Sequence, residues 1–192
     1  MEAGMFYSFD GRVPSVGNGT YVSDTAQVIG DVRIGRNCYV GHGAILRGDY
    51  GTIEVGNETV IEEGVLVHAP PDEACMIGNR VVVGHGAIIH SRSIGDSAMI
   101  GMGAILSIRS EIGGRSIIAE GAVVRQGQQV PASVVMAGNP SRKVREITQA
   151  DRDNEDMSIE LYTNLAKKYL EVGMREVAPT MAKVFSPHHT DE

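Results

Sequence analysis

Aliphatic side chains recur at every sixth position along most of the chain. With small offsets between segments, the full series reads Val22, Val28, Ile34, Val40, Leu46, Val55, Ile61, Val67, Ile77, Val83, Ile89, Ile94, Ile100, Leu106, Ile112, Ile118, Val124, Val130 and Met136. A period of six fits neither the 3.6-residue repeat of an α-helix nor the two-residue alternation of a simple strand. It is typical of a chain that coils in short strands and points one aliphatic side chain per hexapeptide into a narrow prism.

This pattern predicts a mainly β fold, a parallel β-helix. Three hexapeptides complete one coil, and backbone hydrogen bonds stack each coil on the last at about 4.8 Å. The coils run from about Val22 to Met136, and we expect residues 1–147 to form one domain with a short N-terminal extension. The abundance of glycine, 24 residues, suits the tight corners of such a coil.

The six-residue step stops after Gly138-Asn139-Pro140, so we expect residues 141–147 to be a connection. Residues 148–173 are predicted to form a C-terminal α-helix packed on the outside of the prism, with Gly173 as its stop. The apolar positions that suggest this packing recur at every fourth residue, namely Met157, Leu161, Leu165 and Tyr169. We expect the tail, residues 174–192 with His188 and His189, to be mobile and to bind nothing.

Charge, cysteine content and the distribution of apolar residues indicate which partners and which cellular compartment to expect. The net charge is −7 and charges of both signs are interspersed, which argues against a nucleic-acid partner. Cys38 and Cys75 are too few for a disulfide framework, and Cys38 occupies the small-residue corner position after Ile34, where burial is expected. The chain shows neither a basic segment followed by an apolar run at its start nor a long apolar stretch elsewhere. We therefore expect a cytoplasmic protein that does not contact membranes.

The six-residue step also places two histidines. His68 follows the inward residue Val67, and His90 follows the inward residue Ile89. Three hexapeptide steps, one full coil, separate these two anchors. His68 and His90 should therefore stand one above the other on the same face, close enough for two imidazoles to bind one metal ion.

His85 is expected on a different face, because it lies two residues after Val83, one hexapeptide before Ile89. One centre is not easily built from two faces of one prism, but it can form where prisms pack side by side in a cyclic trimer. We infer that His68 and His90 of one chain meet His85 of the next. Three neutral imidazoles with an open fourth position are typical of a catalytic zinc site.

Further polar residues should gather near this metal. Arg47 falls one coil before His68 in the same column, Asp49 lies two residues later, and Glu62 falls on the face of His85. Each has a plain structural alternative: a single surface histidine is usually only solvated, Arg47 and Asp49 can form an ion pair that braces a loop or interface, and Glu62 can be a solvated residue. His42 is expected to be structural or interfacial.

Several segments together carry a specific resemblance. They are Leu46-Arg47-Gly48-Asp49, Gly64-Val65-Leu66-Val67-His68, Gly84-His85-Gly86-Ala87-Ile88-Ile89-His90, Ile100-Gly101-Met102-Gly103-Ala104 and Gly138-Asn139-Pro140-Ser141-Arg142-Lys143-Val144-Arg145. In these segments the sequence resembles the gamma-class carbonic anhydrase family, in particular its short bacterial and archaeal members related to the phenylacetate- and carnitine-pathway hexapeptide proteins.

The resemblance implies a left-handed coil, an exception to the usual right-handed crossover, and a homotrimer. It maps His68, His85 and His90 onto metal ligands, two from one chain and one from the next. It also implies that Arg47 and Asp49 form an interface ion pair whose arginine helps to bind bicarbonate, and that Tyr162 is an active-site tyrosine.

Two departures from the family pattern stand out. Glu62 replaces a glutamine that orients the solvent on the metal. The acidic loop residues that carry protons in the most active members are missing, since Tyr50 follows Asp49 and the loop after His68 is short. Rapid hydration is therefore not expected.

The predicted activity is reversible hydration of carbon dioxide to bicarbonate by a metalloenzyme, a lyase, that uses zinc or else iron or cobalt. A rival reading is an acyl-CoA thioesterase with the same site. Two others are a hexapeptide acyltransferase, which needs a histidine base and no metal, and a non-catalytic trimeric binding or assembly protein.

Overall fold

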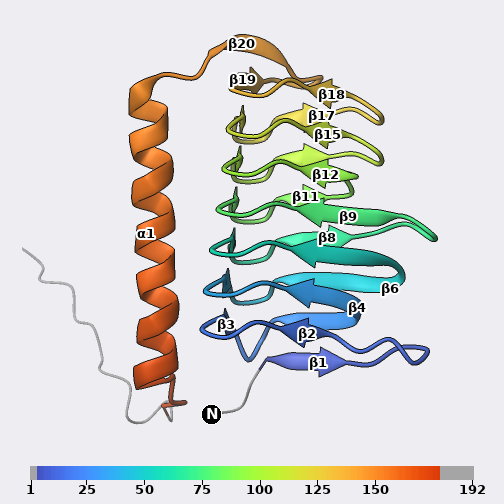
Figure 1. Cartoon of the computed structure of the whole chain (residues 1–192), viewed down its shortest axis with the longest axis vertical. Coiled ribbons are helices and arrows are strands. Elements are labelled where there is room, and N and C mark those ends of the chain that lie inside the picture. The colour runs from blue at the N-terminus through green and yellow to red at the C-terminus, as the bar shows by residue number, and fades with distance from the viewer. Residues whose placement is uncertain (1–3, 178–192) are drawn as a thin grey trace, which may run out of the picture.

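The computed structural model describes residues 4–177. They form a parallel β-helix of about seven turns, and one helix, α1 (Gln149–Val172), lies along its side (Figure 1). This is the mainly β solenoid expected from the six-residue step, and it is consistent with a left-handed coil.

The solenoid has three walls of stacked short strands. The first wall contains β1 (Met5–Tyr7), β8 (Leu66–His68), β11 (Ile88–Ile89), β14 (Ile105–Leu106) and β17 (Val123–Val124). The second contains β2 (Ser15–Val16), β9 (Ala74–Ile77), β12 (Ser93–Ile94), β15 (Glu111–Ile112) and β18 (Gln129–Val130). The third contains β3 (Tyr21–Val22), β5 (Tyr39–Val40), β7 (Val60–Ile61), β10 (Val82–Val83), β13 (Met99–Ile100), β16 (Ile117–Ile118), β19 (Val134–Ala137) and β20 (Arg142–Glu146).

Two longer strands, β4 (Gln27–Ile34) and β6 (Ile45–Val55), belong to both the first and the second walls. The first part of β6 pairs with β8 and its last part pairs with β9. Residues 49–52 lie where the register between β4 and β6 shifts, because Gly48 pairs with Gly30 but Ile53 pairs with Val32. The segment Tyr50-Gly51-Thr52 is therefore part of a bulge within one continuous strand.

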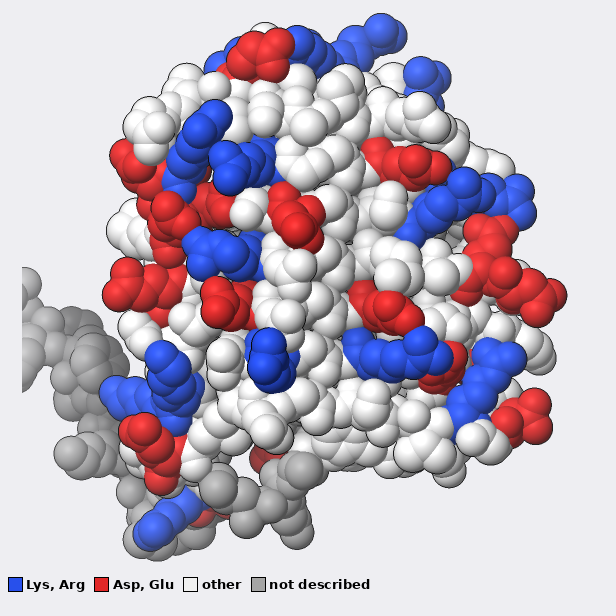
Figure 2. All heavy atoms as spheres, viewed as in Figure 1, with Lys and Arg blue, Asp and Glu red and all other residues white. Residues whose placement is uncertain are grey.

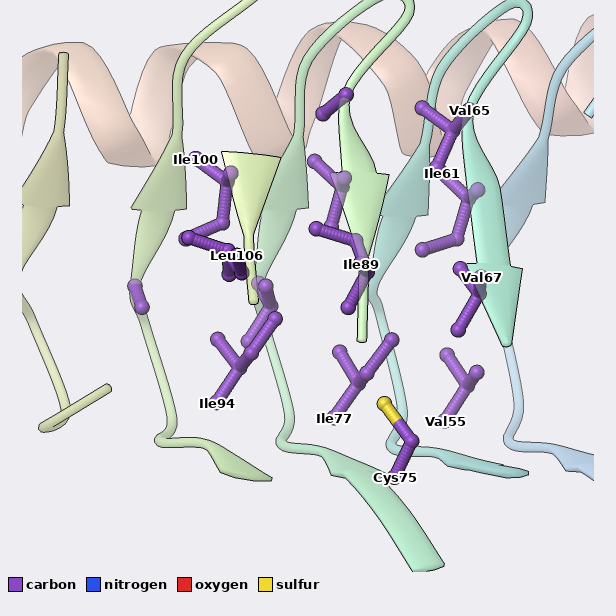
Figure 3. Close-up of a cluster of buried hydrophobic side chains, with 14 of the residues drawn as sticks. Val55, Ile61, Val65, Val67, Cys75, Ile77, Ile89, Ile94, Ile100 and Leu106 are labelled. Atoms are coloured by element: carbon purple, nitrogen blue, oxygen red, sulfur yellow. The ribbon is translucent and has the colours of Figure 1, made fainter. Parts of the chain in front are cut away.

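The anchors of the six-residue step fill the interior of the prism. Figure 3 shows them pointing inward from successive turns. Val67, Ile89 and Leu106 are stacked in register on the first wall and are fully buried. Burial of such a side chain contributes about 1.5–3 kcal/mol. Both cysteines, Cys38 and Cys75, are buried and unpaired among these side chains, as expected for Cys38.

The turn between β10 and β11 carries His85 and depends on Gly86. Gly86 has φ +67°, a left-handed conformation that glycine adopts most easily. A Cβ at Gly86 would meet no atom within 4 Å, so the backbone conformation favours glycine here, whereas lack of space does not. This turn places His85 at the corner between the third and first walls.

The ends of α1 are defined by capping. Thr148 accepts a hydrogen bond from the backbone N–H of Asp151, and the Asp151 side chain accepts one from the backbone N–H of Thr148. Gly173 follows the last residue of the helix, as expected. Beyond it the structure describes only residues 174–177, so most of the expected mobile tail, including His188 and His189, lies outside the described residues.

The packing face of α1 matches the predicted one only in its second half, where Leu165 and Tyr169 pack against the third wall. Met157 and Leu161 are each 62% exposed. A strict four-residue step drifts by about 40° around an α-helix at each repeat, so a stripe with that spacing leaves the contact surface. The residues that face the third wall alternate steps of four and three, namely Glu155, Ile159, Tyr162, Ala166 and Tyr169.

The predictions for both ends of the solenoid also need correction. Residues 141–147 contain β20, which pairs antiparallel with β19 and covers the last rung of the third wall. Every side chain of β20 is exposed, so no apolar period could reveal it. The N-terminal extension contributes β1 and β2, which pair in parallel with β4 and so begin the solenoid before Val22.

Candidate metal centre

His68 and His90 stand one turn apart on the first wall. Each follows an anchor, and those anchors, Val67 and Ile89, pair in register. Nδ1 of His68 lies 3.0 Å from Nε2 of His90, and the ring centroids are 4.7 Å apart. The β-helix backbone therefore brings together two imidazoles that can contact one small ligand or ion.

Arg47 and Asp49 adjoin this pair. Arg47 stands beside His68 in the register of β6 and β8. Its Nη1 donates to Oδ2 of Asp49 at 2.7 Å, while Oδ1 of Asp49 lies 3.5 Å from Nε2 of His68. We call Arg47, Asp49, His68 and His90 the histidine-pair half-site.

Burial and charge set the protonation of this half-site. Burial lowers the pKa of His68 and of His90, and the positive charge of Arg47 lowers both further. Burial alone would raise the pKa of Asp49, but the hydrogen bond and charge of Arg47 outweigh it, and this pKa is lowered. The half-site therefore favours neutral imidazoles beside an ionised carboxylate, and neutral imidazole is the form that binds metals.

These shifts predict that the metal-free protein loses stability in mildly acidic solution. Because the pKa values of His68 and His90 lie below 6.5 in the folded chain, the unfolded chain binds more protons as the pH falls through 6.5. The free energy of unfolding should therefore decrease from above that pH to below it, as urea titrations with a chelator present would show. A His68→Gln, His90→Gln double variant should lose less, and an equal loss in both proteins would contradict the prediction.

His85 lies between two carboxylates at the corner of the third and first walls. Its Nε2 is 3.1 Å from Oε2 of Glu62, and its Nδ1 is 2.9 Å from Oε2 of Glu63. The backbone N–H of His85 also donates to Oε2 of Glu62 at 2.9 Å. The side chain of His85 is nevertheless 45% exposed, so it is presented to the outside of the chain.

Two tyrosines adjoin these carboxylates. The hydroxyl of Tyr39 donates to Oε1 of Glu63 at 2.6 Å. Tyr162, on α1, faces Glu62. Burial raises the pKa of both phenols, and the neighbouring carboxylates raise it further, so both hydroxyls stay protonated. We call Glu62, Glu63, His85 and Tyr162 the His85 half-site.

Sequence reasoning missed Glu63 and Tyr39. Glu63 was detectable, because it stands two residues after the anchor Ile61 just as His85 stands two residues after Val83, and these anchors pair in register. Tyr39 carries no such signal, since its contact with Glu63 depends on side-chain conformation.

The residues present fit a divalent metal ion. Nε2 of His68 is buried and forms no hydrogen bond within residues 4–177, although Oδ1 of Asp49 lies 3.5 Å away. Within residues 4–177 of a single chain, no three His, Cys, Asp or Glu side chains are grouped closely enough to hold an ion. His68 and His90 offer two imidazoles on one wall, and His85 offers a third at a separate corner. Three imidazoles suit zinc, and also iron or cobalt.

A row of aliphatic side chains borders the histidine-pair half-site. Each member precedes an inward anchor and pairs in register with the next, and the row consists of Ile45, Leu66, Ile88, Ile105 and Val123. Ile88 and Ile105 are exposed in the single chain. A continuous apolar patch of this kind is typical of a protein–protein contact. We call it the aliphatic row.

Charged side chains of both signs are mixed on the face of the molecule that Figure 2 shows. Figure 2 shows acidic and basic side chains interspersed there without a continuous basic stripe. The absence of a nucleic-acid partner stays a prediction from the net charge of −7. In the described part of the chain, no helix combines the length and the apolar character needed to cross a bilayer.

Comparisons with known proteins agree on a hexapeptide-repeat relationship. Residues 14–48 match the model of the bacterial transferase hexapeptide family (six repeats). The chain is 34% identical over 176 residues to the carnitine operon protein CaiE of Proteus sp. (strain LE138), which covers 92% of this chain and 89% of that protein. A solved structure of a hexapeptide transferase family protein from Anaplasma phagocytophilum superposes with a TM-score of 0.82 at 32% identity, covering 86% of this chain and 98% of that one.

A plant relative matches this chain with similar sequence identity, but the match covers a smaller share of the relative's own length than the match to CaiE does. The chain is 35% identical over 164 residues to the mitochondrial gamma carbonic anhydrase 1 of Arabidopsis thaliana, which covers 82% of this chain. The chain spans only 60% of the length of that relative. Because the plant relative is mitochondrial, the cytoplasmic location expected for this chain stays a prediction.

Proposed function

Because this chain belongs to the gamma-class carbonic anhydrase-like family of hexapeptide-repeat proteins, we propose that it is a metal-dependent enzyme that reversibly hydrates carbon dioxide to bicarbonate. The observation that carries this proposal is the division of three histidines into two half-sites on different parts of the surface. His68 and His90 lie together, and His85 lies apart from them but is exposed.

The proposed assembly is a homotrimer with its sites between chains. In a ring of three, the histidine-pair half-site of each chain would meet the His85 half-site of the next, a head-to-tail contact that closes on itself. The aliphatic row supports this arrangement, because it lies next to His68 and His90 and would be buried there. Its burial would contribute about 25 cal/mol per Å² of apolar surface removed from water.

His68 and His90 of one chain and His85 of another would hold the metal ion. When bound, the ion would act as a Lewis acid that makes water a stronger acid and so a competent nucleophile near neutral pH. The low pKa of His68 and of His90 favours their neutral, metal-binding form at that pH.

Arg47 would bind the bicarbonate anion. Its guanidinium presents paired N–H donors that match a planar carboxylate-like group. Asp49 accepts a hydrogen bond from Nη1 of Arg47 at 2.7 Å, which orients the guanidinium beside the histidine pair. Asp49 is therefore a positioning residue, whereas Arg47 contacts the substrate.

Glu62 would accept the proton that the attacking water releases. Its carboxylate is largely buried and lies next to the exposed imidazole of His85. A carboxylate can take up this proton, which the amide of a glutamine cannot do. Tyr162, protonated and facing Glu62, would orient that carboxylate.

Stopped-flow hydration assays on the metal-loaded protein test this function. We expect activity that disappears on chelation and that falls about 10- to 100-fold in Arg47→Ala, the loss of a charge-assisted hydrogen bond worth about 1.5–3 kcal/mol. Glu120→Ala, which removes an exposed carboxylate two turns beyond His85 and outside both half-sites, should leave the activity unchanged.

The same preparations distinguish the rival functions. Metal-dependent hydrolysis of acyl-CoA esters without hydration would replace the proposal with thioester hydrolysis. Acyl transfer that survives chelation would indicate an acyltransferase of the hexapeptide type. Absence of all three activities in a metal-loaded trimer would indicate a binding or assembly protein.

A further inference from the structure

The two carboxylates beside His85 contact different nitrogens of its ring. Glu62 lies against Nε2 and also accepts the backbone N–H of His85, whereas Glu63 lies against Nδ1. A ring nitrogen that carries a hydrogen cannot at the same time bind a metal ion. If His85 is a metal ligand, one ring nitrogen keeps its hydrogen bond to a carboxylate. The other ring nitrogen binds the metal ion and loses its hydrogen bond.

The contact with Glu63 is the better supported of the two. Both oxygens of Glu63 are engaged, one by Nδ1 of His85 at 2.9 Å and the other by the hydroxyl of Tyr39 at 2.6 Å. Tyr39 is itself almost fully buried and packs against Tyr21 and Tyr162. Rotation of the Glu63 carboxylate would leave the buried hydroxyl of Tyr39 without its acceptor, which costs about 1–3 kcal/mol.

The fold also sets the spacing of this contact within one chain. Glu63 and His85 each lie two residues after an anchor of the third wall, and those anchors, Ile61 and Val83, pair in register on adjacent rungs. Adjacent rungs stack at about 4.8 Å, which suits a direct hydrogen bond between outward side chains. The arrangement of Tyr39, Glu63 and His85 is thus present before any second chain binds.

We propose that Glu63 is the positioning residue of His85: its carboxylate accepts the Nδ1–H of the imidazole and so leaves Nε2 free to bind the metal ion, while Tyr39 holds Glu63 in place. A carboxylate behind a ligating histidine fixes the tautomer and strengthens the ligand. Glu62, which faces Nε2, is then the carboxylate on the metal side. This inference rests on the proposed function only for the presence of a metal.

Zinc affinity, measured by competition with a fluorescent chelator, tests the role of Glu63. Glu63→Ala should weaken zinc binding about 10- to 100-fold, the usual effect of removing such a contact. Glu63→Gln should recover part of the loss, because its amide oxygen can still accept the Nδ1–H. Glu120→Ala is the matched control, since Glu120 is an exposed carboxylate in the same outward column two rungs beyond His85.

The tautomer of His85 separates positioning from a merely structural role. Long-range ¹H–¹⁵N spectra of the zinc-loaded protein should show the hydrogen on Nδ1, and this signature should be lost in Glu63→Ala while the circular dichroism stays unchanged. Glu63→Met, which keeps the length of the side chain, serves if Glu63→Ala does not fold.

The outcomes distinguish this inference from the proposed function. Equal zinc affinity in Glu63→Ala and Glu120→Ala, or a hydrogen on Nε2 of His85 in the loaded wild-type protein, would overturn the role of Glu63 alone. Tight zinc binding without carbon dioxide hydration would overturn the proposed function and leave the role of Glu63 standing. A wild-type protein that binds no metal would overturn both.

Discussion

Mixed trimers of two inactive variants should recover about a quarter of the wild-type metal sites. His85→Ala removes the ligand of one half-site, and His90→Ala removes a ligand of the other. Each variant alone should bind zinc more than about 100-fold more weakly than the wild type, since loss of a direct ligand exceeds the effect of losing an outer contact. In a random equal mixture, about one interface in four joins an intact histidine pair to an intact His85.

The measurement is zinc bound per chain after the two variants are unfolded and refolded together, with hydration activity as a second readout. A mixture of His90→Ala with His68→Ala is the matched control, because both variants are damaged in the same half-site and no interface can be restored. Recovery in both mixtures, or in neither, would show that the ligands are not shared between chains.

Ile89→Ala should lower the free energy of unfolding by about 2–5 kcal/mol. Ile89 is fully buried and is stacked between Val67 and Leu106 in a narrow prism that holds one such anchor from each of its three walls on every turn. The rungs are held apart by backbone hydrogen bonds, so the cavity can collapse only in part. His90 directly follows this anchor, and zinc affinity should therefore fall as well.

Ile88→Ala is the matched control, since Ile88 is the other residue of β11 and is 39% exposed in the single chain. Its main effect should be on trimer assembly, because Ile88 belongs to the aliphatic row. Urea unfolding at one fixed protein concentration and sedimentation velocity separate the two effects. Equal loss of stability in both variants with the trimer intact would contradict the proposed roles of the two residues.

The sequence predicted the positions of His68 and His90 because each follows an anchor, and the backbone of a β-helix repeats with little freedom. The same six-residue step predicted that His85 lies on a different face from His68 and His90. Periodicity could not reveal β20, whose side chains are all exposed, or the correct face of α1, which depends on whether the spacing averages four residues or three and a half.

Side-chain contacts were beyond the reach of spacing alone. Glu63 adjoins His85 through the register of the third wall, but whether its carboxylate turns toward the ring depends on Tyr39 and on the cover that α1 provides. The roles assigned to Arg47, Asp49, Glu62 and Tyr162, and the three histidine ligands, stay predictions.

α1 begins beside the last turn of the solenoid and runs back toward the first turns (Figure 1). The length of the helix must therefore match the number of turns that it passes. The solenoid residues of both half-sites lie between Arg47 and His90, and the later turns only separate them from the point where α1 begins (Figure 1). Adding one turn of about 18 residues there would lengthen the stack by about 4.8 Å. At about 1.5 Å per helical residue, α1 would need about three or four more residues before Tyr162 to keep that side chain near the level of Glu62. Insertions in the later turns should therefore be tolerated only in matched pairs, one in the solenoid and one in the first half of the helix.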